Sequence, residues 1–459
     1  MKLLKTVLFA AGFTAFSTPV LAEDLLDVYR MARTSDPQIQ AAEYNYLAAK
    51  ESKPQAWANY LPQVNASASQ GTTESESERD ELDFDSQNQT VNVFRIDSAS
   101  ETDSLDWSVS LRQTLFNWGS IQQIQQAGAE VAKAEADFQA AQQELIVRVA
   151  EQYFNLLGAQ DSLEAAQINK ESIGRQLEQS KKRFEVGLIA VTDVQESQAA
   201  YDQAVAEEIA AQRQVTTARE QMRAIVGEYV GNLEAPVESM PLRVPQPAAA
   251  EQWVQMALEQ NLNVISNRFA LDSAEETVDI RRAGHYPTLD LVARHSYSES
   301  DTLVTDTPIP FPSTNREGTT DYIGVELSVP IFSGFRTSSQ VRQAAHQASA
   351  ARSNLTRAMR DTEAQARDAF LGVESDISRV QALKQAYQSS QTALKATQAG
   401  YEVGTRTAVD VLDARRQELQ ARVNYARARY DYILNTLRLK QAAGMLDIND
   451  VEEASRFME

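Results

Sequence analysis

The sequence predicts an α+β protein in which long coiled-coil helices carry amphipathic β-hairpins, built from two internal repeats. Two observations support this fold class. A motif that ends one long helical pattern and begins another occurs twice, at residues 184–194 and 400–413. In each half, a stretch in which apolar and polar residues alternate comes before the helical pattern. A period of two is the signature of a strand with one apolar face.

The repeat is clearest at the two motifs, where residues of the same kind recur 217 positions later. The matched pairs are Phe184 and Tyr401, Gly187 and Gly404, Asp193 and Asp410, and Gly227 and Gly444. Glycine ends helices readily because it adopts left-handed backbone conformations. Thr407, three residues before Asp410, fits a capping box at the start of a new helix. We therefore interpret each motif as the tip of a helical hairpin.

The composition excludes several classes of protein. The 459 residues include 64 acidic and 43 basic side chains, for a formal net charge of −21, and no cysteine. Nucleic acid is not expected as a partner, because phosphate binding requires a basic face. Without cysteine there are no disulfides and no thiolate chemistry. The three histidines lack metal-ligand spacing and no catalytic motif is present, so we expect no cofactor, no metal and no enzyme activity.

Residues 1–22 are interpreted as a secretory signal peptide. Lys2 and Lys5 precede a short apolar core at residues 7–16, and the small residue Ala22 ends the segment. A buried N-terminal helix is the alternative. After residue 22, no apolar run approaches the ~20 residues that a membrane-spanning helix needs. The sequence therefore predicts an exported protein.

The first repeat is expected at residues 23–230. It opens with a helix pair over 24–60, interrupted at Pro37, and a β-hairpin follows at about 63–116. The acidic residues 74–85 are expected to form a solvated, mobile loop of that hairpin. From Gly119 the pattern is helical for some sixty residues, which corresponds to about 90–100 Å. After the tip near 184–194, a shorter helix is expected to end near Gly227.

Within the long helical segments, apolar residues recur every seven positions. The series are Ile124, Val131, Phe138 and Leu145 in the first repeat, and Val373, Val380, Tyr387, Leu394 and Tyr401 in the second. Such spacing is typical of coiled-coil packing rather than of a globular core.

The second repeat is expected at residues 248–446, after a linker at 231–247 that contains four prolines. Its β-hairpin is placed at about 288–332, where Ile323, Val325 and Leu327 alternate with polar residues. A long helical pattern leads from Gly334 to the tip near 400–413. The acidic residues 447–459 are expected to be a C-terminal tail.

Four amphipathic strands cannot close a barrel, which takes about eight. An open sheet with an apolar face would aggregate through its edges, so we expect oligomerisation. A barrel with lipid outside and water inside suits strands that have one apolar and one polar face. A soluble sandwich is the structural alternative. An exported coiled-coil scaffold or adhesin, and a periplasmic adaptor, are alternative interpretations of function.

The chain resembles the TolC family of outer-membrane efflux proteins, most specifically at residues 183–195 and 400–413, and also at 286–291 and 327–332. The resemblance covers nearly all of the chain after residue 22. It implies a homotrimer whose protomers each contribute four strands to one transmembrane β-barrel in outer-membrane lipid, and whose helices form a periplasmic coiled-coil barrel.

The function that the resemblance implies is an exit duct for tripartite efflux and type I secretion systems, gated at the periplasmic helical tip. A periplasmic adaptor (membrane fusion) protein and an inner-membrane efflux or ABC secretion pump would be its partners. The duct would be located in the outer membrane and extend into the periplasm. Transport would be passive, with the energy supplied by the pump.

The resemblance also implies roles for residues at the two tips. The gate links that would hold the tip closed are Thr192, Asp193, Tyr401, Arg406 and Gln176. Tyr401 and Arg406 would bond to Asp193 and Thr192. Gln398 stands where the family usually has a glutamate partner for Gln176. Contacts with the adaptor would come from Gly187, Leu188, Gly404 and Thr405.

Asp410 and Asp413 lie three residues apart, which places both on one face of a helix. In a threefold assembly each would form a ring of carboxylates, a pore constriction that binds cations and hinders anions. Crowding of like charges would raise the pKa values of these rings. The alternative is that Asp193 and Asp410 are first-turn acids that cap helices.

Overall fold

The computed structural model describes residues 23–85, 87, 89–305 and 313–458, so the predicted signal peptide lies outside the described residues. The chain divides into two compact units. Unit 1 contains the described residues of 1–46, 135–265 and 356–459. Unit 2 contains those of 47–134 and 266–355. Among the described residues, no helix is both long enough and apolar enough to cross a membrane.

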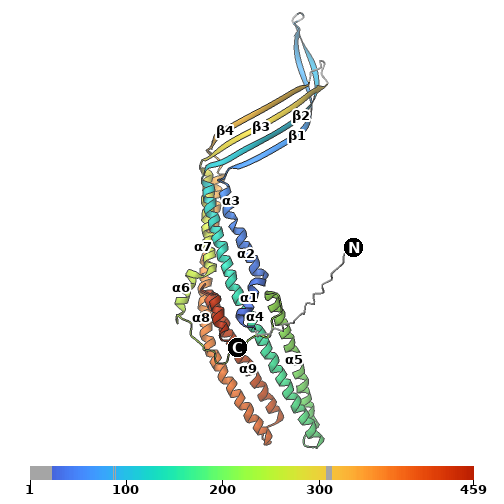
Figure 1. Ribbon diagram of the computed structural model, residues 1–459, viewed down its shortest axis with the longest axis vertical. Helices are drawn as coiled ribbons and strands as arrows, with labels where there is room; N and C mark the ends of the chain where they lie inside the picture. The colour runs from blue at the N-terminus through green and yellow to red at the C-terminus, as the bar shows by residue number, and fades with distance from the viewer. Residues whose placement is uncertain (1–22, 86, 88, 306–312, 459) are drawn as a thin grey trace, which may run out of the picture. The chain divides into compact units, whose positions relative to one another are not determined.

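Unit 2 is built around a four-stranded antiparallel sheet with the order β1-β2-β3-β4 (Figure 1). The strands are β1 (Gln63–Asp85), β2 (Thr90–Asn117), β3 (Thr288–Thr305) and β4 (Thr314–Ser328). The first repeat supplies β1 and β2 and the second supplies β3 and β4. The hairpins join where β2 pairs with β3, with Trp107 opposite Tyr297. The four predicted strands are confirmed, and the pairing of the two repeats makes them one sheet.

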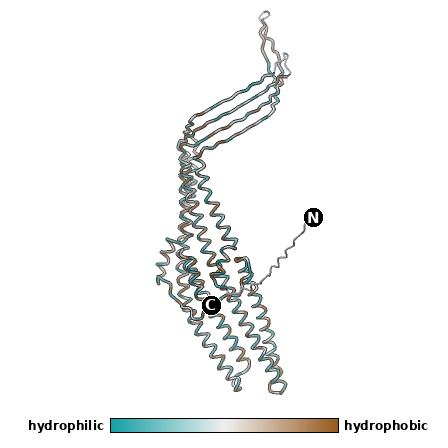
Figure 2. The backbone as a smooth tube through the Cα atoms, in the orientation of Figure 1, coloured by the Kyte–Doolittle hydropathy of each residue, from teal (hydrophilic) through white to brown (hydrophobic). Residues whose placement is uncertain are grey.

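Figure 2 colours both apolar and polar residues along these strands, and the two kinds alternate at residues 323–327 of β4. On β4, the side chains of Ile323, Val325 and Leu327 are 78%, 59% and 65% exposed. Within the described residues, each edge strand also has one side without a backbone partner, because β1 pairs only with β2 and β4 only with β3. In a single chain the sheet therefore has uncovered apolar side chains and two open edges.

The expectation of a mobile loop at residues 74–85 is wrong, because these residues belong to β1. The pairing with β2 continues without a break from Gln63 opposite Arg112 to Asp85 opposite Thr90. Ser75 and Ser77 alternate with acidic residues whose side chains are exposed, so the charges do not oppose the pairing. The backbone ladder with β2, rather than the local composition, determines the conformation of this stretch.

The helices of the first repeat are α1 (Leu25–Ser35), α2 (Pro37–Lys50), α3 (Ser52–Ala58), α4 (Trp118–Glu185) and α5 (Val191–Val226). Those of the second are α6 (Ala250–Gln260), α7 (Leu262–Arg282), the 3-10 turn η1 (Ala283–His285), α8 (Arg336–Glu402), α9 (Ala408–Ala442) and α10 (Ile448–Ser455). The long helices α4 and α8 run through both units and have the expected lengths.

The core of unit 1 lies between two helical hairpins, α4 with α5 and α8 with α9. Leu145, Val373 and Val380, all from the predicted sevenfold series, are at most 3% exposed, so part of each series packs into this core. Polar links also join α4 to α9. The Tyr430 hydroxyl donates to Asp161 over 2.7 Å, and Arg422 pairs with Glu164 at 2.9 Å.

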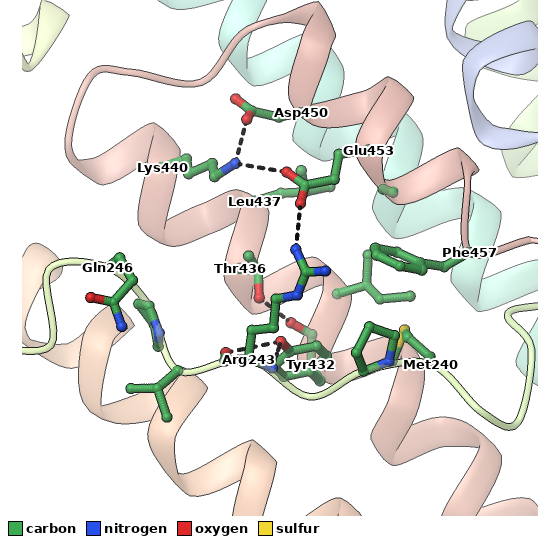
Figure 3. A pocket seen from close by; sticks show the side chains of 15 residues that line it. Met240, Arg243, Gln246, Tyr432, Thr436, Leu437, Lys440, Asp450, Glu453 and Phe457 are labelled. Atoms are coloured by element: carbon green, nitrogen blue, oxygen red, sulfur yellow. Dashed lines mark hydrogen bonds and ion pairs between the residues drawn. The ribbon is translucent and has the colours of Figure 1, made fainter.

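Residues 447–459, expected as a tail, contain α10, which packs on α9 (Figure 3). Val451 and Ala454 are buried there. Lys440 forms ion pairs with Asp450 and, at 3.6 Å, with Glu453. The acidity of this segment thus provides partners for a lysine on α9.

The linker between the repeats is fastened to the same surface. The Tyr432 hydroxyl accepts from the backbone N–H of Arg243 at 2.9 Å and donates to its carbonyl at 3.1 Å. The side chain of Arg243 lies 3.6 Å from Glu453 (Figure 3). Linker, α9 and α10 together line a cavity of about 310 Å³.

Candidate functional site

Both predicted tips are short connections between helices of unit 1. The first joins the end of α4 at Glu185 to the start of α5, and the second joins α8 to α9. Gly187 and Gly404 occupy the same place in the two turns, with φ values of +76° and +80°. Side chains with a Cβ rarely adopt this left-handed conformation, so glycine stabilises each turn.

Asp410 caps α9 through the box that the sequence predicts. The backbone N–H of Thr407 donates to Asp410 Oδ2 at 2.8 Å, and that of Asp410 donates to Thr407 Oγ1 at 3.2 Å. Hydrogen bonds from Thr407 lower the pKa of Asp410 below its usual value, and the bond from the Thr407 backbone N–H has the largest effect. Its carboxylate is therefore charged at neutral pH in the single chain.

Asp193 forms half of such a box at the first tip. The backbone N–H of Ala190 donates to Asp193 Oδ2 at 3.3 Å, but alanine has no oxygen to accept the second bond. Asp193 and Asp410 thus both make capping contacts in the first turn of their helices, as the alternative interpretation of these two residues predicts. These contacts hold each carboxylate in place without burying it.

Tyr401, at the end of α8, is held by two side chains of α4. Gln176 Nε2 donates to its hydroxyl at 3.1 Å, and Arg183 Nη1 donates to the same oxygen at 2.9 Å. The guanidinium carbon of Arg183 also lies 5.1 Å from the centre of the Tyr401 ring. Sequence reasoning named Gln176 and Tyr401 but missed Arg183. Its position directly before Phe184 in the repeated motif is the only signal that could have identified it.

A cavity of about 490 Å³ opens between the two tips. Arg183, Asp193, Tyr401, Asp413 and Arg416 are among its lining residues. Tyr401 and Asp193, to which the family resemblance assigns roles in one gate, therefore line the same cavity.

Three assigned gate residues, Thr192, Arg406 and Gln176, are not in the lining of this cavity. Thr192 and Arg406 are exposed. Along the described part of the chain, no hydrogen bond joins Tyr401 or Arg406 to Thr192 or Asp193. Arg406 instead folds over Gly400, whose carbonyl accepts from the Arg406 backbone N–H at 3.2 Å.

Asp413 faces this cavity and pairs with Arg416 on the next turn of α9, at 3.2 Å. Asp410 is half-buried and Asp413 is exposed, so both carboxylates are within reach of water. Among the described residues, no acidic and histidine side chains cluster in a way that could hold a metal ion.

The turns themselves expose apolar side chains. Leu188 is 72% exposed and Val403 is 76% exposed, each next to the glycine of its turn. Val186 and Val409 are also exposed. Thr405 is used within its own turn, where its hydroxyl donates to the Gly400 carbonyl at 3.0 Å. Apolar side chains gathered at an exposed turn are typical of a surface that contacts another protein.

Known protein families and relatives match almost the whole chain. The family described as outer membrane efflux protein matches residues 28–228 and 253–445, one match in each repeat. The chain is 34% identical over 457 residues to the outer membrane protein TolC of Vibrio cholerae serotype O1, covering 99% of this chain and 98% of that protein. It is 31% identical over 454 residues to the alkaline protease secretion protein AprF of Pseudomonas aeruginosa, covering 98% and 91%.

Solved structures share the fold. The outer membrane protein VceC of Vibrio cholerae superposes with a TM-score of 0.70 at 21% identity, covering 92% of this chain and 96% of that one. The outer membrane channel CmeC of Campylobacter jejuni gives a TM-score of 0.71 at 17% identity, covering 95% and 90%. This chain therefore shares its fold, four antiparallel strands with long helices, with these two outer-membrane proteins.

Proposed function

Because the chain belongs to the outer membrane efflux protein family, we infer that it is an outer-membrane channel through which inner-membrane pumps expel or secrete their substrates. It is not an enzyme, and it extends from the outer membrane into the periplasm. The relatives in this family include proteins named for efflux and for protease secretion, so both cargo classes suit this chain.

The observation that best supports the proposed channel is the sheet itself, which has exposed apolar side chains and two open edges. Exposed Ile323, Val325 and Leu327 on β4 would be costly in water, and the edges of β1 and β4 would pair with other chains. Three copies that join β4 of one protomer to β1 of the next would close a barrel, with the apolar side chains facing lipid. In this homotrimer, both open edges of each sheet would pair with the edges of neighbouring protomers.

The partners of the proposed channel are a periplasmic adaptor (membrane fusion) protein and an inner-membrane efflux or ABC secretion pump. The exposed Leu188 and Val403 at the two turns support adaptor contact there, with Gly187, Gly404 and Thr405 shaping the turns. Burying these apolar side chains against an adaptor would stabilise the docked state.

The gate is proposed to lie at the same tips. In a trimer, Tyr401 and Arg406 would bond to Asp193 and Thr192 and hold the α8–α9 hairpin closed. The cavity that Tyr401 and Asp193 share supports this arrangement, and so does the exposure of Thr192 and Arg406 in the single chain, which leaves both side chains accessible to another protomer. Charge-assisted hydrogen bonds suit a gate because they are directional and can exchange for water.

The test is planar-bilayer recording on detergent-purified protein, with the oligomeric mass measured in the same detergent. Trimers that give small, cation-selective currents are the expected result. Protein that extracts without detergent and gives no conductance would overturn the channel and favour an exported scaffold or adhesin.

Neutralising the proposed carboxylate rings should weaken block by multivalent cations. In the Asp410→Asn, Asp413→Asn variant, asparagine keeps an oxygen for the Thr407 cap bond but removes the charge. We expect half-block by a trivalent cation such as lanthanum to need a roughly tenfold higher concentration, since each ring loses its Coulomb attraction.

The matched control is Glu185→Gln with Glu402→Gln, which removes two carboxylates per protomer at the ends of α4 and α8, outside the cavity lining. This control should keep the lanthanum block. Block at full strength in the Asp410→Asn, Asp413→Asn variant would show that neither aspartate forms a cation-binding ring.

A further inference from the structure

We propose that Arg183 is a positioning residue of the gate, which grips Tyr401 from α4 of the same protomer and so holds the α8–α9 hairpin in the closed position. This inference rests on the gate proposed above. It adds a link between α4 and the end of α8 to the links of that gate, and it concerns a residue to which neither the sequence nor the family resemblance assigned a role.

The contact engages both parts of the tyrosine. Arg183 Nη1 donates to the hydroxyl at 2.9 Å, while the guanidinium carbon lies 5.1 Å from the ring centre. A guanidinium can combine hydrogen bonding with attraction to an aromatic face because it is planar and delocalised. One side chain therefore restrains the position of the ring and the position of its hydroxyl.

Gln176 completes the grip from the same helix. It lies seven residues before Arg183, two turns away on the same face of α4, and donates to the Tyr401 hydroxyl at 3.1 Å.

The two donors also orient the hydroxyl proton. A tyrosine oxygen can accept two hydrogen bonds and donate one. With Gln176 and Arg183 occupying the acceptor positions, the O–H remains to donate, and Asp193 lines the same cavity. Arg183 thus positions Tyr401 for the bond to a carboxylate that the gate requires.

The experiment compares the closed-state conductance of single trimers in planar bilayers. Arg183→Gln should raise the closed-state conductance at least twofold, because glutamine supplies neither the positive charge nor the contact with the Tyr401 ring. Arg175→Gln is the matched control. Arg175 lies on the same helix, but it is exposed and pairs with Glu171 of its own helix at 3.5 Å. Its replacement should leave the conductance at the unmodified value.

A double-mutant cycle with Tyr401→Phe separates positioning from a general effect of charge. If Arg183 acts through Tyr401, Arg183→Gln should change conductance less in the Tyr401→Phe background than in the unmodified protein. Equal changes in both backgrounds would overturn the inference. Trimer mass and circular dichroism identify any variant that fails to fold, and Arg183→Lys, which keeps the charge, then replaces Arg183→Gln in the cycle.

The failure of this inference is distinguishable from failure of the gate. Unchanged conductance in Arg183→Gln, with raised conductance in the Tyr401→Phe, Arg406→Ser variant, would contradict the role of Arg183 but support the gate. Unchanged conductance in both variants would contradict the proposed gate and, with it, the role of Arg183.

Discussion

Single-channel conductance should rise several-fold in the Tyr401→Phe, Arg406→Ser variant, without loss of trimers. Tyr401 would lose the two hydrogen bonds from Gln176 and Arg183, in addition to its proposed gate bonds to Asp193 and Thr192. Two bonds at about 1 kcal/mol each correspond to a roughly 30-fold change in the ratio of open to closed gates. Planar-bilayer recording measures the change directly.

A second tyrosine–arginine pair in unit 1 offers the control. Arg223, near the end of α5 opposite the tip, lies 5.0 Å from the ring centre of Tyr229. Tyr229→Phe with Arg223→Ser makes the same chemical change away from the gate and should leave the conductance unaltered. Conductance that stays unaltered in the tip variant as well would exclude Tyr401 and Arg406 from the gate.

Replacing Gly444 with alanine should strongly destabilise unit 1. The backbone of Gly444 has a φ of +74°, and an added Cβ would lie 2.2 Å from the carbonyl oxygen of Gln260 and 2.8 Å from the nitrogen of Asn261. These are backbone atoms between α6 and α7, so relief of the clash requires the junction to move. We expect a loss of about 3 kcal/mol or more in the free energy of unfolding.

Such movement would also disturb the contacts that fix the end of α9. The Asn261 side chain donates to the carbonyl of Ala442 at 2.9 Å, and that of Gln143 donates to the carbonyl of Gly444 at 3.2 Å. Losing either bond leaves a partly buried carbonyl without its partner, which adds to the cost of the clash. Thermal unfolding followed by circular dichroism measures the loss.

Gly227, the counterpart of Gly444 in the first repeat, is the matched control. Its φ is +87°, but the nearest atom to an added Cβ is the Cβ of Ser35, at 3.4 Å. Gly227→Ala should therefore cost only the penalty for a left-handed residue, about 1 kcal/mol. Equal losses at both glycines would show that the contact with the α6–α7 junction does not matter.

The sequence by itself determined the features whose physics is local. The turns at Gly187 and Gly404 were predictable because glycine itself readily adopts the left-handed backbone conformation that these turns require. The box of Thr407 and Asp410 was predictable because a cap joins residues three apart. The coiled-coil spacing and the alternation along the strands follow from the periods of helix and strand, which a single chain displays directly.

Only the tertiary structure decided the features that depend on distant partners. Residues 74–85 are a strand because β2 pairs with them, although their acidity is typical of a loop. Residues 447–459 hold a helix because Lys440 and the surface of α9 accept it. Arg183 meets Tyr401, 218 residues later, because two hairpins lie side by side. Contacts between residues so far apart leave no period or spacing in the sequence, and they arise only when the helices pack.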